Sequence, residues 1–115
     1  MGVNDYWGRT PPAKTVTNIR RLIKFLRGRI KSISGVAPYI AVATLTPNGR
    51  AFQRPFVEAV NTRLLALDSP QFPVRLRFDT LPETILSEDL LHPNGAGYDL
   101  MTDVRETFLR GPCQK

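Results

Sequence analysis

The stretch PYIAVATL, residues 38–45, is short and almost wholly apolar, and turn-forming residues stand on both sides of it. Such a run has no polar face to turn toward water, which is typical of a strand that helices cover on both faces. Strands of this kind belong to parallel sheets. The run therefore predicts a central strand of a parallel sheet over residues 38–45.

Helical patterns precede and follow this run. Thr10 is an N-cap candidate with Pro11 at the first helical position. Apolar residues then recur at three- and four-residue steps: Val16, Ile19, Leu22, Ile23, Leu26 and Ile30. After the turn Pro47-Asn48-Gly49, a second apolar stripe ends near Asp68-Ser69-Pro70 and comprises Phe56, Val57, Val60, Leu64, Leu65 and Leu67. Both stripes predict amphipathic helices.

The last third of the chain predicts one more strand and one more helix. The segment VRLRF, residues 74–78, alternates apolar and basic residues, which indicates a strand near the edge of the sheet. Asn94 is an N-cap candidate for a helix marked by Tyr98, Met101, Val104 and Phe108. The alternation of helices and strands predicts an α/β fold with parallel strands. Only two full strands are visible, so we expect residues 1–5 to add a third, or something outside the chain to complete the sheet.

Length and charge set further limits. The chain has 115 residues, of which 42% are hydrophobic, and predicts a single domain over residues 1–115. Its net charge of +6 arises largely from the basic face of the first long helix, which includes Arg20, Arg21 and Lys24. That face could bind an acidic partner or nucleic acid, but solvated basic faces are common, so we do not expect a nucleic-acid partner.

Targeting signals and metal ligands are scarce in the sequence. Cys113 is the single cysteine, so we expect neither an intrachain disulfide nor a thiolate metal cluster. Neither a signal-peptide pattern nor an apolar run of about 18 residues occurs. We therefore expect a soluble chain without a membrane span, and its cellular compartment stays open.

Two short blocks combine residue types that catalysis uses. Gly2-Val3-Asn4-Asp5 lies near the start, and Asp89-Leu90-Leu91-His92-Pro93-Asn94-Gly95-Ala96-Gly97-Tyr98 lies near the end. A carboxylate three residues before a histidine can hold one ring nitrogen and leave the other free to take a proton. Loops at the carboxyl ends of parallel strands meet in one crevice, so distant blocks can share a site. Each block taken alone also has a structural explanation, as an Asx turn or a solvated loop histidine.

Taken together, in this order and with these elements between them, the blocks make the chain resemble the C-terminal half of SGNH (GDSL-type) hydrolases. The resemblance implies a partial three-layer flavodoxin-like parallel sheet flanked by helices, as one truncated domain. It also implies a carboxylic-ester hydrolase acting on a small-molecule ester without a cofactor or metal. By resemblance, Asn4 donates to the oxyanion, His92 is the general base and Asp89 orients its imidazole.

The chain departs from that family in its nucleophile. The G-D-S block and a second oxyanion glycine belong before the G-x-N-D block and are not in this sequence, and Ser32, Ser34, Ser69 and Ser87 have no comparable context. We therefore expect weak hydrolysis, or activity that depends on a homo-oligomer or a complementing chain. Two alternatives remain: a non-catalytic basic α/β module that binds an acidic partner or nucleic acid, and a structural fragment without a function of its own.

Overall fold

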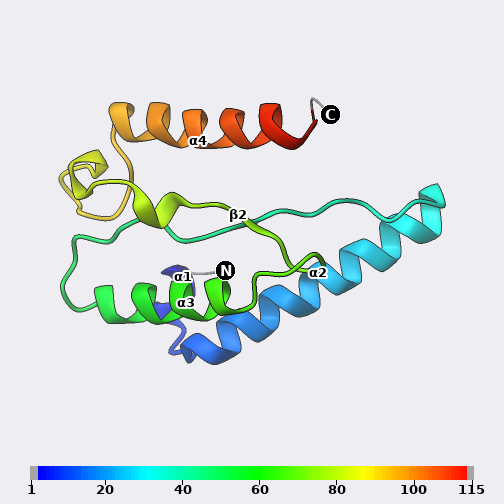
Figure 1. The fold of residues 1–115 in the computed structure, drawn as a ribbon. Helices are drawn as coiled ribbons and strands as arrows, with labels where there is room; N and C mark the ends of the chain where they lie inside the picture. Colours follow the sequence, from blue (N-terminus) through cyan, green and yellow to red (C-terminus); the bar gives the residue numbers. More distant parts are fainter. Residues whose placement is uncertain (1–2, 114–115) are drawn as a thin grey trace.

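Four helices surround one pair of short parallel strands in residues 3–113, the part of the chain that the computed structural model describes (Figure 1). The helices are α1 (Val3–Trp7), α2 (Pro12–Ser34), α3 (Arg54–Ala66) and α4 (Gly95–Cys113), and the strands are β1 (Val42–Ala43) and β2 (Val74–Leu76). Two 3₁₀ turns, Phe78–Thr80 and Glu83–Ile85, follow β2. Helices α2 and α3 lie on one side of the strands and α4 lies on the other (Figure 1).

The parallel pairing of the two predicted strands is confirmed. Val42 N–H donates to the Pro73 carbonyl at 2.8 Å, and Thr44 N–H donates to the Leu76 carbonyl at 3.0 Å. The first strand is shorter than the predicted range 38–45. In the described residues β1 pairs only with β2, so its predicted central position has no second partner here.

The expected third strand does not appear in the part of residues 1–5 that the structure describes. Residues 3–5 belong to helix α1, while Met1 and Gly2 lie outside the described residues. Extended structure needs a neighbouring strand to bond its backbone groups, whereas a helix bonds them internally. A segment without a strand partner is therefore satisfied as a helix.

Helix α2 begins one residue later than predicted. Pro11 occupies the N-cap position and Pro12 opens the helix, so Thr10 does not cap it. The helix ends at Ser34 and its C-cap is Gly35, whose φ of 78° is left-handed and whose N–H donates to the Lys31 carbonyl at 2.8 Å. Proline suits the first position because no N–H is needed there, and glycine suits a left-handed end because it lacks a Cβ atom.

The hydrophobic core lies where α2 and α3 cross the strands. Val60 and Leu64 of α3 are completely buried. They pack with buried residues from α2, the strands and the loop before β2: Val16, Ile23, Val42, Phe72 and Val74. Both predicted apolar stripes therefore supply core residues.

Only part of the apolar stripe of α2 is buried by the rest of the described chain. Leu22, Leu26 and Ile30 of the predicted stripe remain exposed, as do Phe25 and Ile33 with exposed fractions of 65% and 76%. The C-terminal half of α2 extends beyond α3 (Figure 1). The C-terminal half of α2 therefore keeps most of its apolar side chains exposed in the described structure.

Candidate active site

Asp89 and His92 form a hydrogen-bonded pair on the loop that follows β2. His92 Nδ1 lies 2.5 Å from Asp89 Oδ2. The other carboxylate oxygen, Oδ1, accepts the backbone N–H groups of Leu91 at 2.9 Å and of His92 at 3.0 Å. The predicted contact between the Asp89 carboxylate and the His92 ring is therefore present, and it forms within residues 89–92.

The electrostatics of this pair keep the carboxylate ionised. The bond to the His92 ring, followed by the two backbone N–H bonds, lowers the pKa of Asp89 far below its usual range. An ionised carboxylate accepts Nδ1–H, which leaves Nε2 to accept a proton. The His92 side chain is 68% exposed, so a reacting group can reach Nε2 from solvent.

An unusual backbone conformation shapes the loop. Leu90 has a φ of 60°, in the left-handed region that side chains other than glycine seldom adopt. Its N–H donates to the Ser87 carbonyl at 3.0 Å, and Ser87 N–H donates to the His92 carbonyl at 2.7 Å. Strain of this kind persists only where the surroundings fix it, and it is concentrated at functional sites.

The turn after β1 holds this loop in place. Gly49 N–H donates to the Leu90 carbonyl at 2.9 Å, and Arg50 Nε donates to the Asp89 carbonyl, also at 2.9 Å. The two segments follow β1 and β2, so they meet at the carboxyl ends of the parallel strands. Arg50 was not among the predicted site residues, because a contact across 39 positions leaves no local sequence pattern.

Hydrogen bonds of two buried side-chain amides hold the segment that contains Gly49 and Arg50. Asn48 and Gln53 are both buried, and Asn48 Nδ2 donates to Gln53 Oε1 at 3.0 Å. Asn48 Oδ1 accepts the Arg50 N–H at 2.8 Å. These bonds hold the segment that supports the Asp89 backbone, and the observed turn, residues 51–53, lies just after the predicted Pro47-Asn48-Gly49 turn.

Asn4 lies on α1, exposed to solvent. Tyr6 of the same helix packs its ring against Phe52 and Phe56, with centroids 6.0 and 5.9 Å apart, at the start of α3. The Thr15 hydroxyl donates to Asp5 Oδ2 at 2.8 Å and ties α1 to α2. Helix α1 thus rests on the chain that directly follows the turn supporting Asp89.

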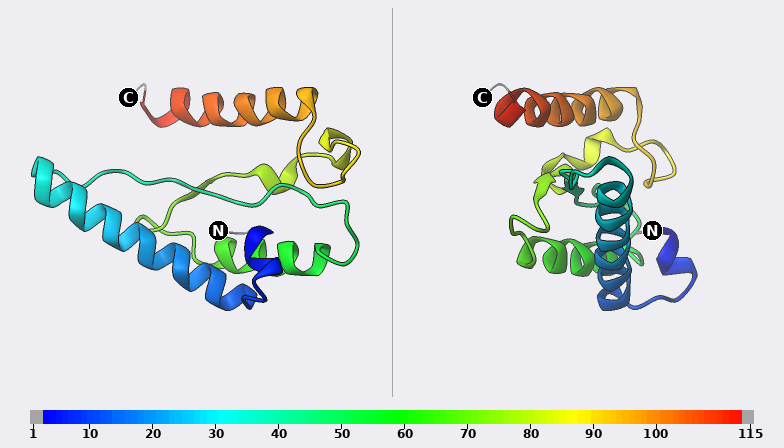
Figure 2. Two further views of the ribbon diagram at one scale, coloured as in Figure 1. Left: turned by 180° about the vertical axis from the view of Figure 1, so that it is seen from behind. Right: turned by 90° about the vertical axis from the view of Figure 1, so that its right-hand side faces the viewer.

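Asn4 and the Asp89–His92 loop belong to separate parts of the fold, α1 and the segment that leads into α4. In the right-hand view of Figure 2, α1 and the loop that leads into α4 both lie to the right of α2. Within the described residues Asn4 makes no hydrogen bond to Asp89 or His92. The structure brings Asp89 and His92 into contact and does not bring Asn4 into contact with them.

The described serines with resolved bonds donate to or accept from the backbone. Ser87 Oγ donates to the Pro93 carbonyl at 3.2 Å, although it lies in the same loop as His92. Ser34 Oγ donates to the Ile30 carbonyl, and Ser69 Oγ accepts the Phe72 N–H. These three hydroxyls therefore have structural roles in the described structure. The side chain of Cys113 lies outside the described residues.

Asn94 and Gly97 join the loop to α4. Asn94 Oδ1 accepts the Gly97 N–H at 2.8 Å, which is the predicted N-cap bond. The Asn94 backbone N–H donates to the Ile85 carbonyl at 2.6 Å. A Cβ atom on Gly97 would lie 2.6 Å from that carbonyl oxygen and 3.0 Å from Pro93 Cβ, so only glycine fits here.

Gly97→Ala is expected to destabilise the fold by about 1–3 kcal/mol, because the added methyl group must displace the Ile85 backbone carbonyl. Gly95→Ala is the matched control, since nothing lies within 4 Å of a Cβ atom at that position. It should change the free energy of unfolding by less than about 1 kcal/mol. Urea unfolding of both variants checks this, and equal values would contradict the close packing at Gly97.

The bond between His92 and Asp89 predicts how Asp89 titrates. In the intact chain the Asp89 carboxylate should stay ionised well below its ordinary pKa of 3.8. Stability that depends on this depressed pKa is present above that ordinary value and is lost as the pH falls through the folded value. In His92→Ala the midpoint should rise toward 3.8, because the largest cause of the shift is removed.

The measurement is an NMR titration of carboxyl carbon signals, and Asp68 is its internal control. The pKa of Asp68 is also lowered, by the Val74 N–H and by Arg75, neither of which involves His92. Its midpoint should not move in His92→Ala. An Asp89 midpoint that also stays in place would show that the ring bond does not form in solution.

The described residues include no helix long and apolar enough to cross a membrane. In the same part of the chain, no group of three or more His, Cys, Asp or Glu side chains is arranged to hold a metal ion. Comparisons of the chain with protein-family models, with curated proteins and with solved structures found no match.

Proposed function

We propose that this chain is part of an SGNH-type carboxylic-ester hydrolase and supplies its acid–base pair. The observation that carries the proposal is the Asp89–His92 hydrogen bond, held on a strained loop at the carboxyl end of β2. The order of the G-x-N-D and D-x-x-H-P blocks along the sequence supports the same family. The parallel strands with helices on both sides fit a portion of the flavodoxin-like sheet that this family uses.

In this proposal His92 moves the proton. Its Nε2 atom takes the proton from an attacking hydroxyl or water while the oxygen bonds to the ester carbonyl carbon. Asp89 holds Nδ1–H and stabilises the imidazolium that forms. The tetrahedral intermediate then expels the alcohol, which receives the proton back from Nε2. Attack by water gives the carboxylic acid directly, whereas attack by a hydroxyl leaves an acyl group on that oxygen, which water activated by His92 then releases as the acid.

Asn4 would act on the carbonyl oxygen. Its Nδ2–H would donate to the oxygen as negative charge develops there, which would lower the barrier to the tetrahedral intermediate. The contacts of Tyr6 with Phe52 and Phe56 would serve to hold α1 in position. Asn4 is exposed, as is His92, so both are accessible to a substrate at the surface.

The nucleophile would come from outside the described residues. Ser34, Ser69 and Ser87 bond to backbone groups, and none of those bonds involves the His92 ring. With water as the nucleophile we expect only slow hydrolysis of activated aryl esters. Full activity would require a segment or a partner chain that places a serine hydroxyl beside Nε2.

The exposed apolar surface of α2 supports a complementing chain or a second copy. Leu22, Phe25 and Ile33 would each gain cover from such a partner, and burial of a side chain of this size is worth about 1.5–3 kcal/mol. We expect light scattering to show self-association that rises with concentration and weakens in Phe25→Ser/Ile33→Ser. A monodisperse monomer at high concentration would contradict this expectation.

The test of the proposed function is an esterase assay in two parts. The purified chain, incubated with p-nitrophenyl acetate, should release p-nitrophenol faster than free imidazole does at the same concentration. The coding DNA upstream of Met1 is read for an in-frame G-D-S block, and the encoded segment is then mixed with the chain. A rise in rate supports the proposal, whereas no hydrolysis under either condition overturns it.

A further inference from the structure

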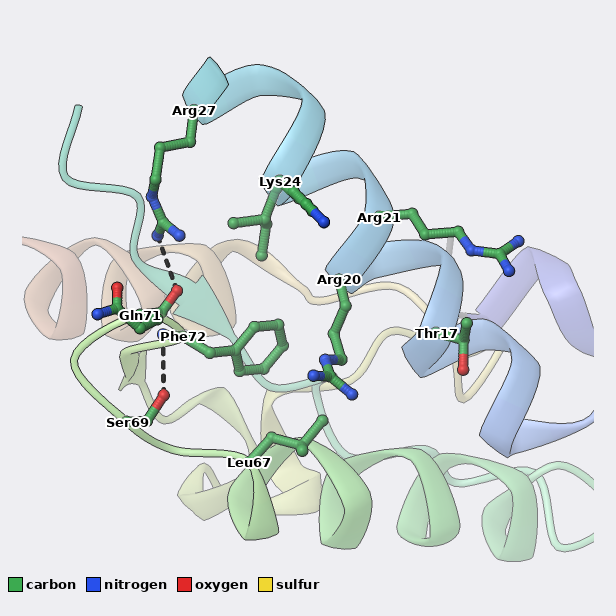
Figure 3. A pocket seen from close by; sticks show the side chains of 10 residues that line it. Thr17, Arg20, Arg21, Lys24, Arg27, Leu67, Ser69, Gln71 and Phe72 are labelled. Carbon is green, nitrogen blue, oxygen red and sulfur yellow. Dashed lines mark hydrogen bonds between the residues drawn. The ribbon is translucent and has the colours of Figure 1, made fainter. Parts of the chain in front are cut away.

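A basic cleft lies between α2 and the loop that joins α3 to β2. Its volume is about 660 Å³, the size of a small-molecule site. Figure 3 shows Arg20 directed toward Leu67 and Phe72, Arg27 directed toward Gln71, and Arg21 directed away from Phe72. The lining of the basic cleft includes four cationic side chains and three apolar side chains: Arg20, Arg21, Lys24, Arg27, Ile23, Leu67 and Phe72.

Acidic side chains do not neutralise this cleft. None lines it, and the sequence has no Asp or Glu between Asp5 and Glu58. The ion pairs of the described residues use cations elsewhere: Arg54, Arg75, Arg77, His92 and Arg110. Arg27 NH2 donates to the Gln71 carbonyl at 2.7 Å, which leaves Arg20 and Lys24 to meet an anion.

The apolar side chains of the cleft add a further requirement. Ile23 and Phe72 are buried core residues that line the cavity, and Leu67, the C-cap residue of α3, lines it too. Thr17 and Ser69 contribute hydroxyl groups at the margin. A ligand that satisfies this surface carries concentrated negative charge at one end and an apolar group at the other.

A phosphate monoester fits these groups best. A guanidinium group binds two phosphate oxygens at once, and a lysine adds a point charge for the same group. Two negative charges on one group match the cationic side chains of the cleft better than the single charge of a carboxylate. Binding of a nucleic-acid strand would instead require several exposed aromatic rings on which successive bases stack, and the described cleft lining contains only one aromatic residue, Phe72.

The arrangement on α2 favours a soluble ligand over a flat lipid surface. At about 100° per residue, Arg20, Lys24 and Arg27 lie within one narrow arc of the helix. The exposed Phe25 and Ile33 lie on roughly the opposite side. A membrane that contacts those apolar side chains would therefore not reach the basic cleft.

We propose that the basic cleft binds a soluble phosphate monoester that carries an apolar group. The cleft lies before β2, at the opposite end of the strands from the Asp89–His92 loop. The inference is therefore independent of the proposed esterase activity. Loss of phosphate binding would not affect the esterase proposal, and absence of esterase activity would not affect the proposed phosphate site.

Calorimetric titration with 1-naphthyl phosphate tests the site, with 1-naphthol and inorganic phosphate as its separate parts. We expect the ester to bind at least about tenfold more tightly than 1-naphthol or inorganic phosphate, because only the ester contacts both the cationic and the apolar side chains of the cleft. In labelled wild-type protein, the amide NMR signals of Thr17, Ser69 and Gln71 should shift on addition. Binding of the ester no tighter than that of inorganic phosphate would overturn the proposal.

Paired charge variants separate the cleft from general attraction to a basic protein. Arg20→Gln/Lys24→Gln should weaken binding at least about tenfold. Lys14→Gln/Arg29→Gln removes the same net charge from α2 outside the cleft lining and should weaken it less than about twofold. Equal losses in the two variants would show that the cleft is not the site.

Vesicles of phosphatidic acid in phosphatidylcholine distinguish a lipid from a soluble ligand. Phosphatidic acid presents a phosphate monoester at a membrane surface. We expect no binding of these vesicles that depends on Arg20 and Lys24. If the vesicles bind and Arg20→Gln/Lys24→Gln abolishes that binding, the ligand is a lipid phosphate headgroup and the proposal of a soluble phosphate monoester is wrong.

Discussion

Replacing His92 with alanine is expected to lower the rate of hydrolysis of an activated aryl ester by roughly 10²-fold or more, the usual contribution of a general base. His92 is the only histidine in the chain, so no other imidazole can take its place. Asp89→Asn should also lower the rate, because an amide oxygen holds Nδ1–H without the negative charge that stabilises the imidazolium. The measurement is kcat/KM for p-nitrophenyl acetate, with or without a complementing segment.

Glu88→Gln is the matched control for this prediction. Glu88 is an exposed acidic residue of the same loop, directly beside Asp89. Its replacement should leave the rate within about twofold, while circular dichroism checks that each variant keeps its helices. If His92→Ala hydrolyses the ester as fast as the intact chain, His92 is not the base and the proposed mechanism is wrong.

Asn4→Ala is expected to lower kcat by about 10²-fold, because the loss of one oxyanion donor acts on the transition state more than on the bound ester. Asn4→Asp should be at least as slow, since a carboxylate cannot donate and repels the developing charge. Asn18→Ala on α2 serves as a control that also removes a carboxamide. A change in KM with kcat intact would instead assign Asn4 to substrate binding.

Much of the fold follows from local patterns in the sequence. The stripe containing Val60 and Leu64 predicted α3 to within two residues at its start, and its members form the core. Asn94 predicted the start of α4 because an N-cap acts on its own neighbouring N–H groups. The Asp89–His92 contact was predictable for the same reason, since three residues of one loop decide it.

The remaining features depend on contacts that the local sequence does not encode. Arg50 supports the Asp89 backbone from a different loop, and the left-handed conformation of Leu90 has no glycine to signal it. Strand β1 is shorter than its apolar run because strand length depends on the partners available to it. Residues 3–5 are helical for the same reason, since no neighbouring strand is present in the described residues.

The proposed common site of Asn4 and His92 can be tested directly with a spin label. A nitroxide is attached to Asn4→Cys in a Cys113→Ser background, and a second sample carries it on Ser32→Cys near the far end of α2. Because the chain has a single histidine, its imidazole proton signals are assigned without ambiguity. The label at residue 4 should broaden those signals strongly and the label at residue 32 should not. Sharp imidazole signals with the label at residue 4 would contradict a common site for these two groups.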